Sequence, residues 1–158
     1  MPLLALIIGA LVVIADQIIK YFIVTCLKPV GTVTVIDGLF NLTYVENRGV
    51  AFGMFQDMRV LFIVLTSLFI FAIVFYMFKN RPEGRLFYVL AGLIIGGGVG
   101  NLIDRIIYGY VIDYLSLSFF PPVCNFADYC ITVGVAILAV YYFVKSAGKD
   151  KKKVKKND

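Results

Sequence analysis

Ionisable side chains interrupt strongly apolar stretches of this 158-residue sequence, and these interruptions are the first candidates for chemistry. Asp16 and Lys20 lie in one apolar run, Asp113 is flanked by apolar and aromatic residues, and Asp128 follows Asn125 at the start of another apolar run. A charge at the centre of a bilayer costs about 2.5–3.5 kcal/mol, even on lenient insertion scales. Ionisable groups in such surroundings are therefore functional candidates.

The residue types that are absent limit the reactions that remain. The sequence has no histidine, which excludes a Ser-His or Cys-His nucleophile and a His-ligated metal. The three cysteines, Cys26, Cys124 and Cys130, lack CxxC spacing, and we interpret them as apolar fillers. Catalysis would have to use carboxylates, thiols, amines, phenols or hydroxyls.

Asp113 and Asp128 are the pair whose chemistry is easiest to define. The Pro121-Pro122 turn between them could fold one carboxylate toward the other. Two facing carboxylates in a low-dielectric cleft cannot both ionise cheaply, so one keeps a proton while the other acts as a base. This is the working state of an aspartyl protease. The alternative, with Asn125 as a helix N-cap and Asp128 in the first turn, leaves Asp113 unexplained.

Two further groups of polar residues have both a structural and a functional interpretation. Asp16 and Lys20 are four residues apart on one helix face, so they can pair and neutralise each other. Asn101 and Arg105 also share a face. Arg105 can compensate the negative end of a helix while Asp104 is solvated, or it can bind a carbonyl or carboxylate of a ligand.

Composition indicates the elements that must position these residues. Hydrophobic residues make up 61% of the chain and charged residues 16%, whereas soluble domains have roughly 45–50% and about 25%. A span needs about 20 apolar residues. We predict an all-α membrane protein with four transmembrane helices, the first retained rather than cleaved as a signal peptide. The four runs are Leu3 to Leu27, Val60 to Phe78, Leu86 to Ile103 and Cys124 to Val144.

The connections between these runs predict an orientation and a small β element. Basic residues concentrate in 79–85 and in the tail, which places both on the cytoplasmic side and exports residues 28–59 and 104–123. Residues 31–45 alternate in polarity around Asp37-Gly38, a pair that suits a hairpin turn. Residues 106–123 are too apolar for an ordinary loop, so we expect them to dip into the membrane interface.

The net charge of +5 comes entirely from residues 145–158, because acidic and basic residues balance in 1–144. We therefore predict one transmembrane domain, 1–144, with an extracytoplasmic β element at about 28–57, and a Lys-rich cytoplasmic tail, 145–158. A basic tail after a span is typical of contact with anionic lipid headgroups, and we expect no nucleic-acid binding.

Five short motifs in order resemble those of lipoprotein signal peptidase, also called signal peptidase II. The resemblance covers about residues 10–135, and one such motif alone would be weak. The motifs are Asp16-x-x-x-Lys20, Asn47-x-Gly49-x-Ala51-Phe52-Gly53, Gly100-Asn101-Leu102-Ile103-Asp104-Arg105, Val111-Ile112-Asp113-Tyr114 and Asn125-Phe126-Ala127-Asp128.

The resemblance implies an aspartic endopeptidase of the bacterial cytoplasmic membrane, with its active site on the outer side and both termini cytoplasmic. It implies cleavage of diacylglyceryl-modified prolipoproteins just before the lipobox cysteine, with Asp113 and Asp128 as catalytic dyad. It implies no metal and no organic cofactor, and the expected partners are the lipidated prolipoprotein and membrane lipids, with the enzyme a monomer. The implied substrate-binding residues are Asn47, Asn101, Arg105, Asn125, Asp16 and Lys20, whereas Asp104 is implied to be structural.

Two other classes of function remain open at this point. Asp16, Lys20, Asp113 and Asp128 could form the proton relay of a small transporter or channel, although such carriers usually show duplicated halves. Alternatively, the polar residues could only hold the helices of a non-enzymatic assembly factor together.

Overall fold

The computed structural model describes residues 1–49 and 58–157, and the side chains up to residue 144. The described part of the chain contains four long helices, and each is long and apolar enough to span a membrane, as predicted. They are α1 (Pro2–Phe22), which continues as the π-helix η1 (Ile23–Leu27), α2 (Arg59–Asn80), α3 (Arg85–Ile107) and α4 (Phe126–Asn157). The apolar part of α4 ends at Val144, and the helix continues into the lysine-rich segment.

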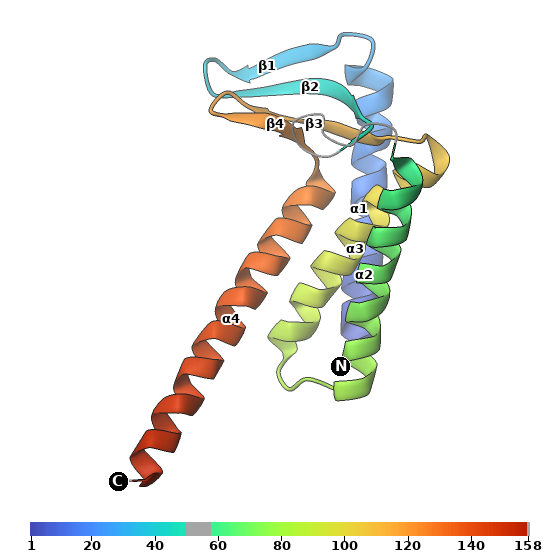
Figure 1. Cartoon of the computed structure of the whole chain (residues 1–158). Helices are drawn as coiled ribbons and strands as arrows, with labels where there is room; N and C mark the ends of the chain where they lie inside the picture. Colours follow the sequence, from blue (N-terminus) through green and yellow to red (C-terminus); the bar gives the residue numbers. More distant parts are fainter. Residues whose placement is uncertain (50–57, 158) are drawn as a thin grey trace.

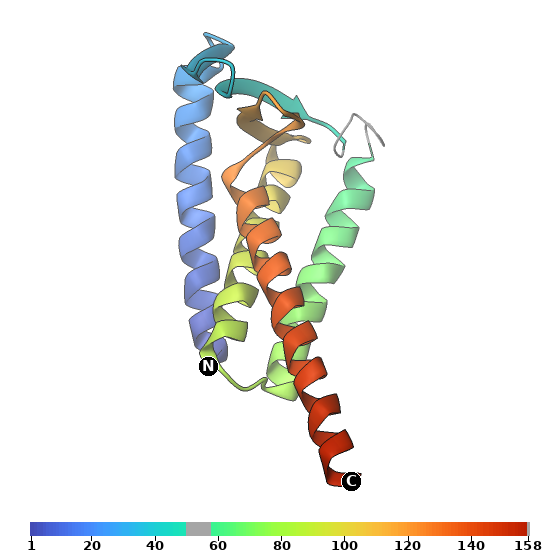
Figure 2. The ribbon, with the colours of Figure 1, turned by 90° about the vertical axis from the view of Figure 1, so that its left-hand side faces the viewer.

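Helix α3 is the centre of the bundle (Figures 1 and 2), where it packs against each of the other three helices. Its glycines allow this close approach, because they have no side chain to keep the helices apart. A Cβ atom on Gly100 would lie 2.5 Å from Asp16 Oδ2 of α1, and one on Gly97 would lie 2.5 Å from the Ala127 carbonyl oxygen of α4. The glycines therefore set the distance between α3 and the helices that carry the polar residues.

The outer faces of the other helices are apolar and exposed. On α2, for example, Leu68, Phe71 and Phe75 are all more than half exposed. Such a surface would be unfavourable in water, but it matches lipid chains, which are as apolar as the side chains themselves. The bundle thus encloses its buried polar residues and an apolar core, and it presents an apolar surface outward.

A four-stranded antiparallel sheet lies across one end of the bundle (Figure 1). Its strands, in spatial order, are β1 (Thr32–Ile36), β2 (Phe40–Asn47), β3 (Val111–Leu117) and β4 (Phe120–Cys124). The predicted hairpin is confirmed as β1 and β2, and Gly38 in its turn has φ 68°, a conformation that favours glycine. The fold class of four membrane helices with a small β element is therefore confirmed.

The second half of the sheet was not predicted. Residues 106–123 were expected only to dip into the interface, yet most of them form β3 and β4. The first four residues of β3 are buried on both faces, so the strand lacks the alternation that would reveal it. Pro121 and Pro122 also argue against a strand, but β4 is an edge strand, where a missing N–H is tolerated.

We predict that Gly97→Ala destabilises the bundle even though alanine is the better helix former. The new methyl group would meet backbone of α4, which cannot rotate away, and overpacking of this kind typically costs about 1–3 kcal/mol. Thermal unfolding in detergent should show a lower Tm for this variant.

Gly98→Ala is the matched control, because the nearest atom to its new methyl group is the flexible end of Ile70 at 3.2 Å. Its Tm should equal or exceed that of the parent protein. Equal Tm values for Gly97→Ala and the parent would show that the approach of α4 to α3 is not limited by this residue.

Candidate active site

Asp113 and Asp128 meet where the sheet rests on the helices. Asp113 is carried by β3 and is 1% exposed, whereas Asp128 lies in the first turn of α4. Asn125 bonds to both: its Nδ2 donates to Asp113 Oδ1 at 2.6 Å, and its backbone N–H donates to Asp128 Oδ2 at 3.1 Å. Two carboxylates that are far apart in sequence thus share one hydrogen-bonding partner.

The start of α4 positions Asp128 through local hydrogen bonds. The backbone N–H of Asp128 donates to Asn125 Oδ1 at 2.9 Å, and Asp128 Oδ2 accepts from the backbone of Asn125. This reciprocal arrangement is a capping box, so the predicted N-cap role of Asn125 is confirmed. The same residue also bonds to Asp113, so its capping and positioning roles are not alternatives.

Asn47, at the end of β2, holds the other oxygen of Asp113. Its Nδ2 donates to Asp113 Oδ2 at 2.8 Å. Its Oδ1 accepts from the backbone N–H of Gly49 at 3.0 Å, which leaves the amide nitrogen facing Asp113. The register of β2 on β3, with Val45 opposite Asp113, brings the two side chains into reach.

The surroundings of Asp113 favour its protonated form. Burial, followed by the nearby Asp128 carboxylate, raises the pKa of Asp113 to about 7, against the opposing effect of the Asn47 and Asn125 hydrogen bonds. A carboxyl group with this pKa can hold or release a proton near neutral pH.

A buried ion cluster lies beneath the two carboxylates. Lys20 Nζ is 2.8 Å from Asp16 Oδ2 and 2.8 Å from Asp104 Oδ2, and all three side chains are at most 2% exposed. The predicted pairing of Asp16 with Lys20 is confirmed. The interpretation of Asp104 as a solvated residue is wrong, because the side chain is fully buried and also accepts from the backbone N–H of Ile112 at 3.1 Å.

Asn101 connects this cluster to Asp128. Its Oδ1 accepts from Lys20 Nζ at 3.0 Å and from Asn125 Nδ2 at 3.1 Å, while its Nδ2 donates to Asp128 Oδ1 at 2.7 Å. An ammonium group can only donate hydrogen bonds, so the Asn101 side-chain amide must turn its oxygen toward Lys20. The amide nitrogen must then face Asp128.

Arg105 lies at the mouth of the site. Its guanidinium lies 5.3 Å from the centre of the Phe62 ring and donates a long bond of 3.4 Å to the Asn101 carbonyl oxygen. Together with Asn47 and Asp128 it lines a cleft of about 300 Å³ whose other side is apolar. The cleft therefore combines a cation, one side-chain amide and a carboxylate with walls suited to apolar groups.

Sequence reasoning missed two contributors to this site. Gln17 donates to Asp104 Oδ1 at 3.1 Å and to Asp16 Oδ2 at 3.2 Å, and only its position beside Asp16 pointed to it. Cys124 lines the cleft, but burial raises its pKa to about 11, so the thiol stays protonated and unreactive at neutral pH. Residues 50–53 of the second motif lie outside the described residues.

None of the described residues forms a group of three or more Cys, Asp or Glu side chains suited to hold a metal ion. What the site offers is one carboxylate, Asp128, on the wall of a cleft and a second, Asp113, that is joined to it through Asn125.

The solved structures that this chain resembles include two of bacterial membrane enzymes. One, determined by the in meso method at 2.3 Å, has a TM-score of 0.85 and 29% sequence identity, and the match covers 92% of this chain and 90% of that one. The other, at 1.9 Å, has a TM-score of 0.78 and 30% identity, with 87% and 91% covered.

Sequence comparison points to one family. The lipoprotein signal peptidase of Caldanaerobacter subterraneus subsp. tengcongensis is 44% identical over 142 residues, which are 90% of this chain and 97% of the relative. That of Clostridium acetobutylicum is 38% identical over 156 residues, 96% and 99% respectively. The family model described as signal peptidase (SPase) II matches residues 8–144. The chain therefore belongs to the signal peptidase II family.

Proposed function

We propose that this protein is a membrane aspartyl endopeptidase that removes the signal peptide from diacylglyceryl-modified bacterial prolipoproteins, just before the lipobox cysteine. The observation that carries the proposal is the convergence of Asp113 and Asp128 on Asn125 at the edge of a cleft. The family supports the substrate, because its curated relatives are lipoprotein signal peptidases.

Peptide hydrolysis follows from an unequal sharing of one proton. Asp113, with a pKa of about 7, is the member that holds the proton, and Asp128 accepts two hydrogen bonds that favour its carboxylate. Asp128 deprotonates a water, which attacks the peptide carbonyl, while Asp113 donates to the developing oxyanion. The proton taken from water then passes to the leaving nitrogen as the C–N bond breaks.

Three asparagine amides hold the two carboxylates in position, and the Arg105 guanidinium is proposed to bind the substrate. Asn47, Asn101 and Asn125 fix the carboxylate oxygens, and Arg105 presents its charge to the cleft, where it would bind a substrate carbonyl. Asp16 and Lys20 were predicted as substrate-binding residues. Because they are at most 2% exposed, we propose that they act through Asn101 rather than by contact.

The proposed orientation places the sheet and the cleft at the outer face of the bacterial cytoplasmic membrane, with both termini inside. The basic connection between α2 and α3 supports this orientation. A lipid-modified cysteine at the end of a signal peptide is held at the same depth, so a monomeric enzyme can reach the scissile bond while the acyl chains remain in lipid.

The substrate assignment predicts that the purified protein in detergent cuts a diacylglyceryl-modified preprotein and leaves the unlipidated form intact. The products are identified by mass spectrometry, which also gives the cleavage position. Equal cutting of both forms would remove the lipid requirement from the proposal, and no cutting of either would contradict the function itself.

The dyad predicts that Asp113→Asn and Asp128→Asn each lower the rate by at least about a hundredfold, the low end of what general acid–base catalysis contributes. Both changes preserve shape, so the binding of lipidated substrate should persist. Asp37→Asn, which alters an exposed aspartate in the turn between β1 and β2, is the control and should cleave at the parent rate. Near-parent rates for either dyad variant would refute the assignment.

The raised pKa of Asp113 predicts how the rate depends on pH. Catalysis needs Asp113 protonated, so kcat/KM should fall as pH rises through about 7, approaching tenfold per pH unit above it. Protonation of the partner carboxylate should lower the rate again in acid, which makes the profile a bell. Thermal unfolding at each pH separates loss of activity from loss of fold. A flat profile from about pH 4 to 9 with chemistry rate-limiting would contradict the shared proton.

A further inference from the structure

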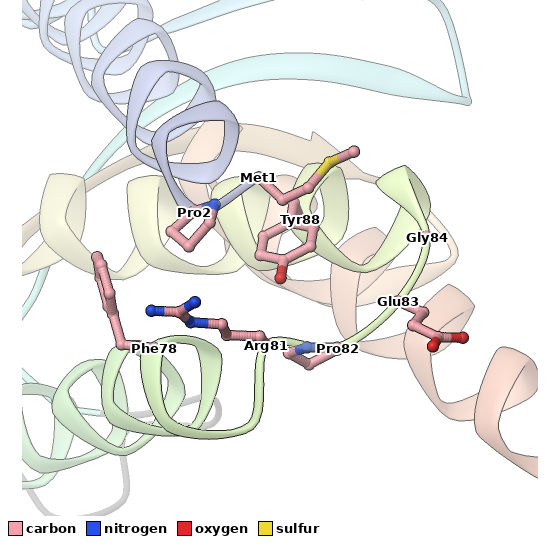
Figure 3. Close-up of a pocket in the computed structure, with 8 residues that line it drawn as sticks. All are labelled: Met1, Pro2, Phe78, Arg81, Pro82, Glu83, Gly84 and Tyr88. Atoms are coloured by element: carbon pink, nitrogen blue, oxygen red, sulfur yellow. The ribbon is translucent and has the colours of Figure 1, made fainter.

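A second cavity, of about 500 Å³, lies at the end of the bundle opposite the sheet. It is open on one side and is lined by the start of α1, the end of α2, the turn that follows and the start of α3 (Figure 3). Its walls include Pro2, Phe78 and Pro82, and it is separate from the cleft beside Asp128. Nothing in the proposed peptidase mechanism uses this cavity.

Two polar groups face the cavity without a partner. Tyr88 is 1% exposed, and Figure 3 shows its hydroxyl directed into the cavity toward Arg81. Neither that hydroxyl nor the Arg81 guanidinium forms a hydrogen bond or an ion pair with any residue in the part of the chain that the structure describes. The hydroxyl opens onto the cavity and the Arg81 side chain is exposed, so both are available to hydrogen-bond a ligand that enters it.

Arg81 also has an unfavourable backbone conformation. It follows the last residue of α2 with φ 44° and ψ 58°, the left-handed conformation that glycine usually supplies at this position. Among the described residues it is the one non-glycine with positive φ. Backbone conformations of this kind cluster at functional sites, where the surrounding structure holds them in place.

The depth and the charge of the cavity indicate the kind of ligand. Three membrane-spanning helices begin or end around it, so it lies where hydrocarbon gives way to lipid headgroups. Residues 79–85 carry three basic side chains and one acidic one, Glu83, whose carboxylate points away from the Arg81 guanidinium (Figure 3). A guanidinium beside apolar walls at this depth suits a phosphate that carries acyl chains.

We propose that this cavity binds the headgroup of an anionic phospholipid, with its phosphate on the Arg81 guanidinium and the Tyr88 hydroxyl. The glycerol and the first acyl carbons would lie against Phe78 and Pro2. Guanidinium and phosphate can form two parallel charge-assisted hydrogen bonds, which gives the site a preference over general attraction to a basic surface.

Native mass spectrometry of the purified full chain in detergent tests this site without any substrate, so its outcome is independent of the proposed peptidase function. The protein is titrated with phosphatidylglycerol or with phosphatidylcholine. We expect one phosphatidylglycerol to bind at concentrations where phosphatidylcholine does not, and to raise the Tm. Equal binding of the two lipids would overturn the proposal, because the apolar walls alone would then account for it.

A pair of variants separates a site from a diffuse charge effect. Arg81→Gln should weaken phosphatidylglycerol binding by at least about tenfold, the scale of a lost charge-assisted contact. Arg85→Gln removes the same charge from a neighbouring residue outside the cavity and should change binding less than about twofold, as expected for a screened surface charge. Equal losses in the two variants would overturn the site, as would an Arg81→Gln protein that binds like the parent while keeping its Tm.

Discussion

The rest of the structure depends on the ion pairs that the buried Lys20 ammonium group forms with Asp16 and Asp104. It is buried between α1 and α3, where it contacts two carboxylates and one amide oxygen at 2.8–3.0 Å. In such surroundings a lone charge would be very costly, and removing one partner of a buried pair typically costs about 3–5 kcal/mol. The cluster therefore fixes how the first and third helices pack, and glycines on α3 provide the space for it.

The same ammonium group determines the orientation of the hydrogen bonds above it. Because it can only donate, the Asn101 amide must present its nitrogen to Asp128, and Asn125 then connects Asp128 to Asp113. Structure and proposed chemistry are thus not separable in this interior. A change at Lys20, whose side chain is 2% exposed, would alter both the packing of the helices and the charge felt by the two carboxylates.

The sequence alone predicted the local features of the fold and the site, but it did not predict the long-range ones. The spans, the β1 and β2 hairpin, the Asp16 and Lys20 pair and the Asn125 cap all depend on residues close in sequence. Asp104 was misjudged because its partner is on another helix, and helical spacing alone says nothing about such a contact. Strands β3 and β4 were missed because burial on both faces and a proline pair conceal the alternation that indicates a strand.

One of the two carboxylates lies on the sheet and the other on the last helix, and this separation has a consequence for biosynthesis. Asp113 belongs to the sheet, whereas Asp128 opens the last helix in the chain. A nascent protein with three helices in the bilayer would have only one of the two acids and no Asn125. Under the proposed mechanism, proteolytic competence would arise only when the final helix has inserted, and immature copies would not cut neighbouring polypeptides during membrane integration.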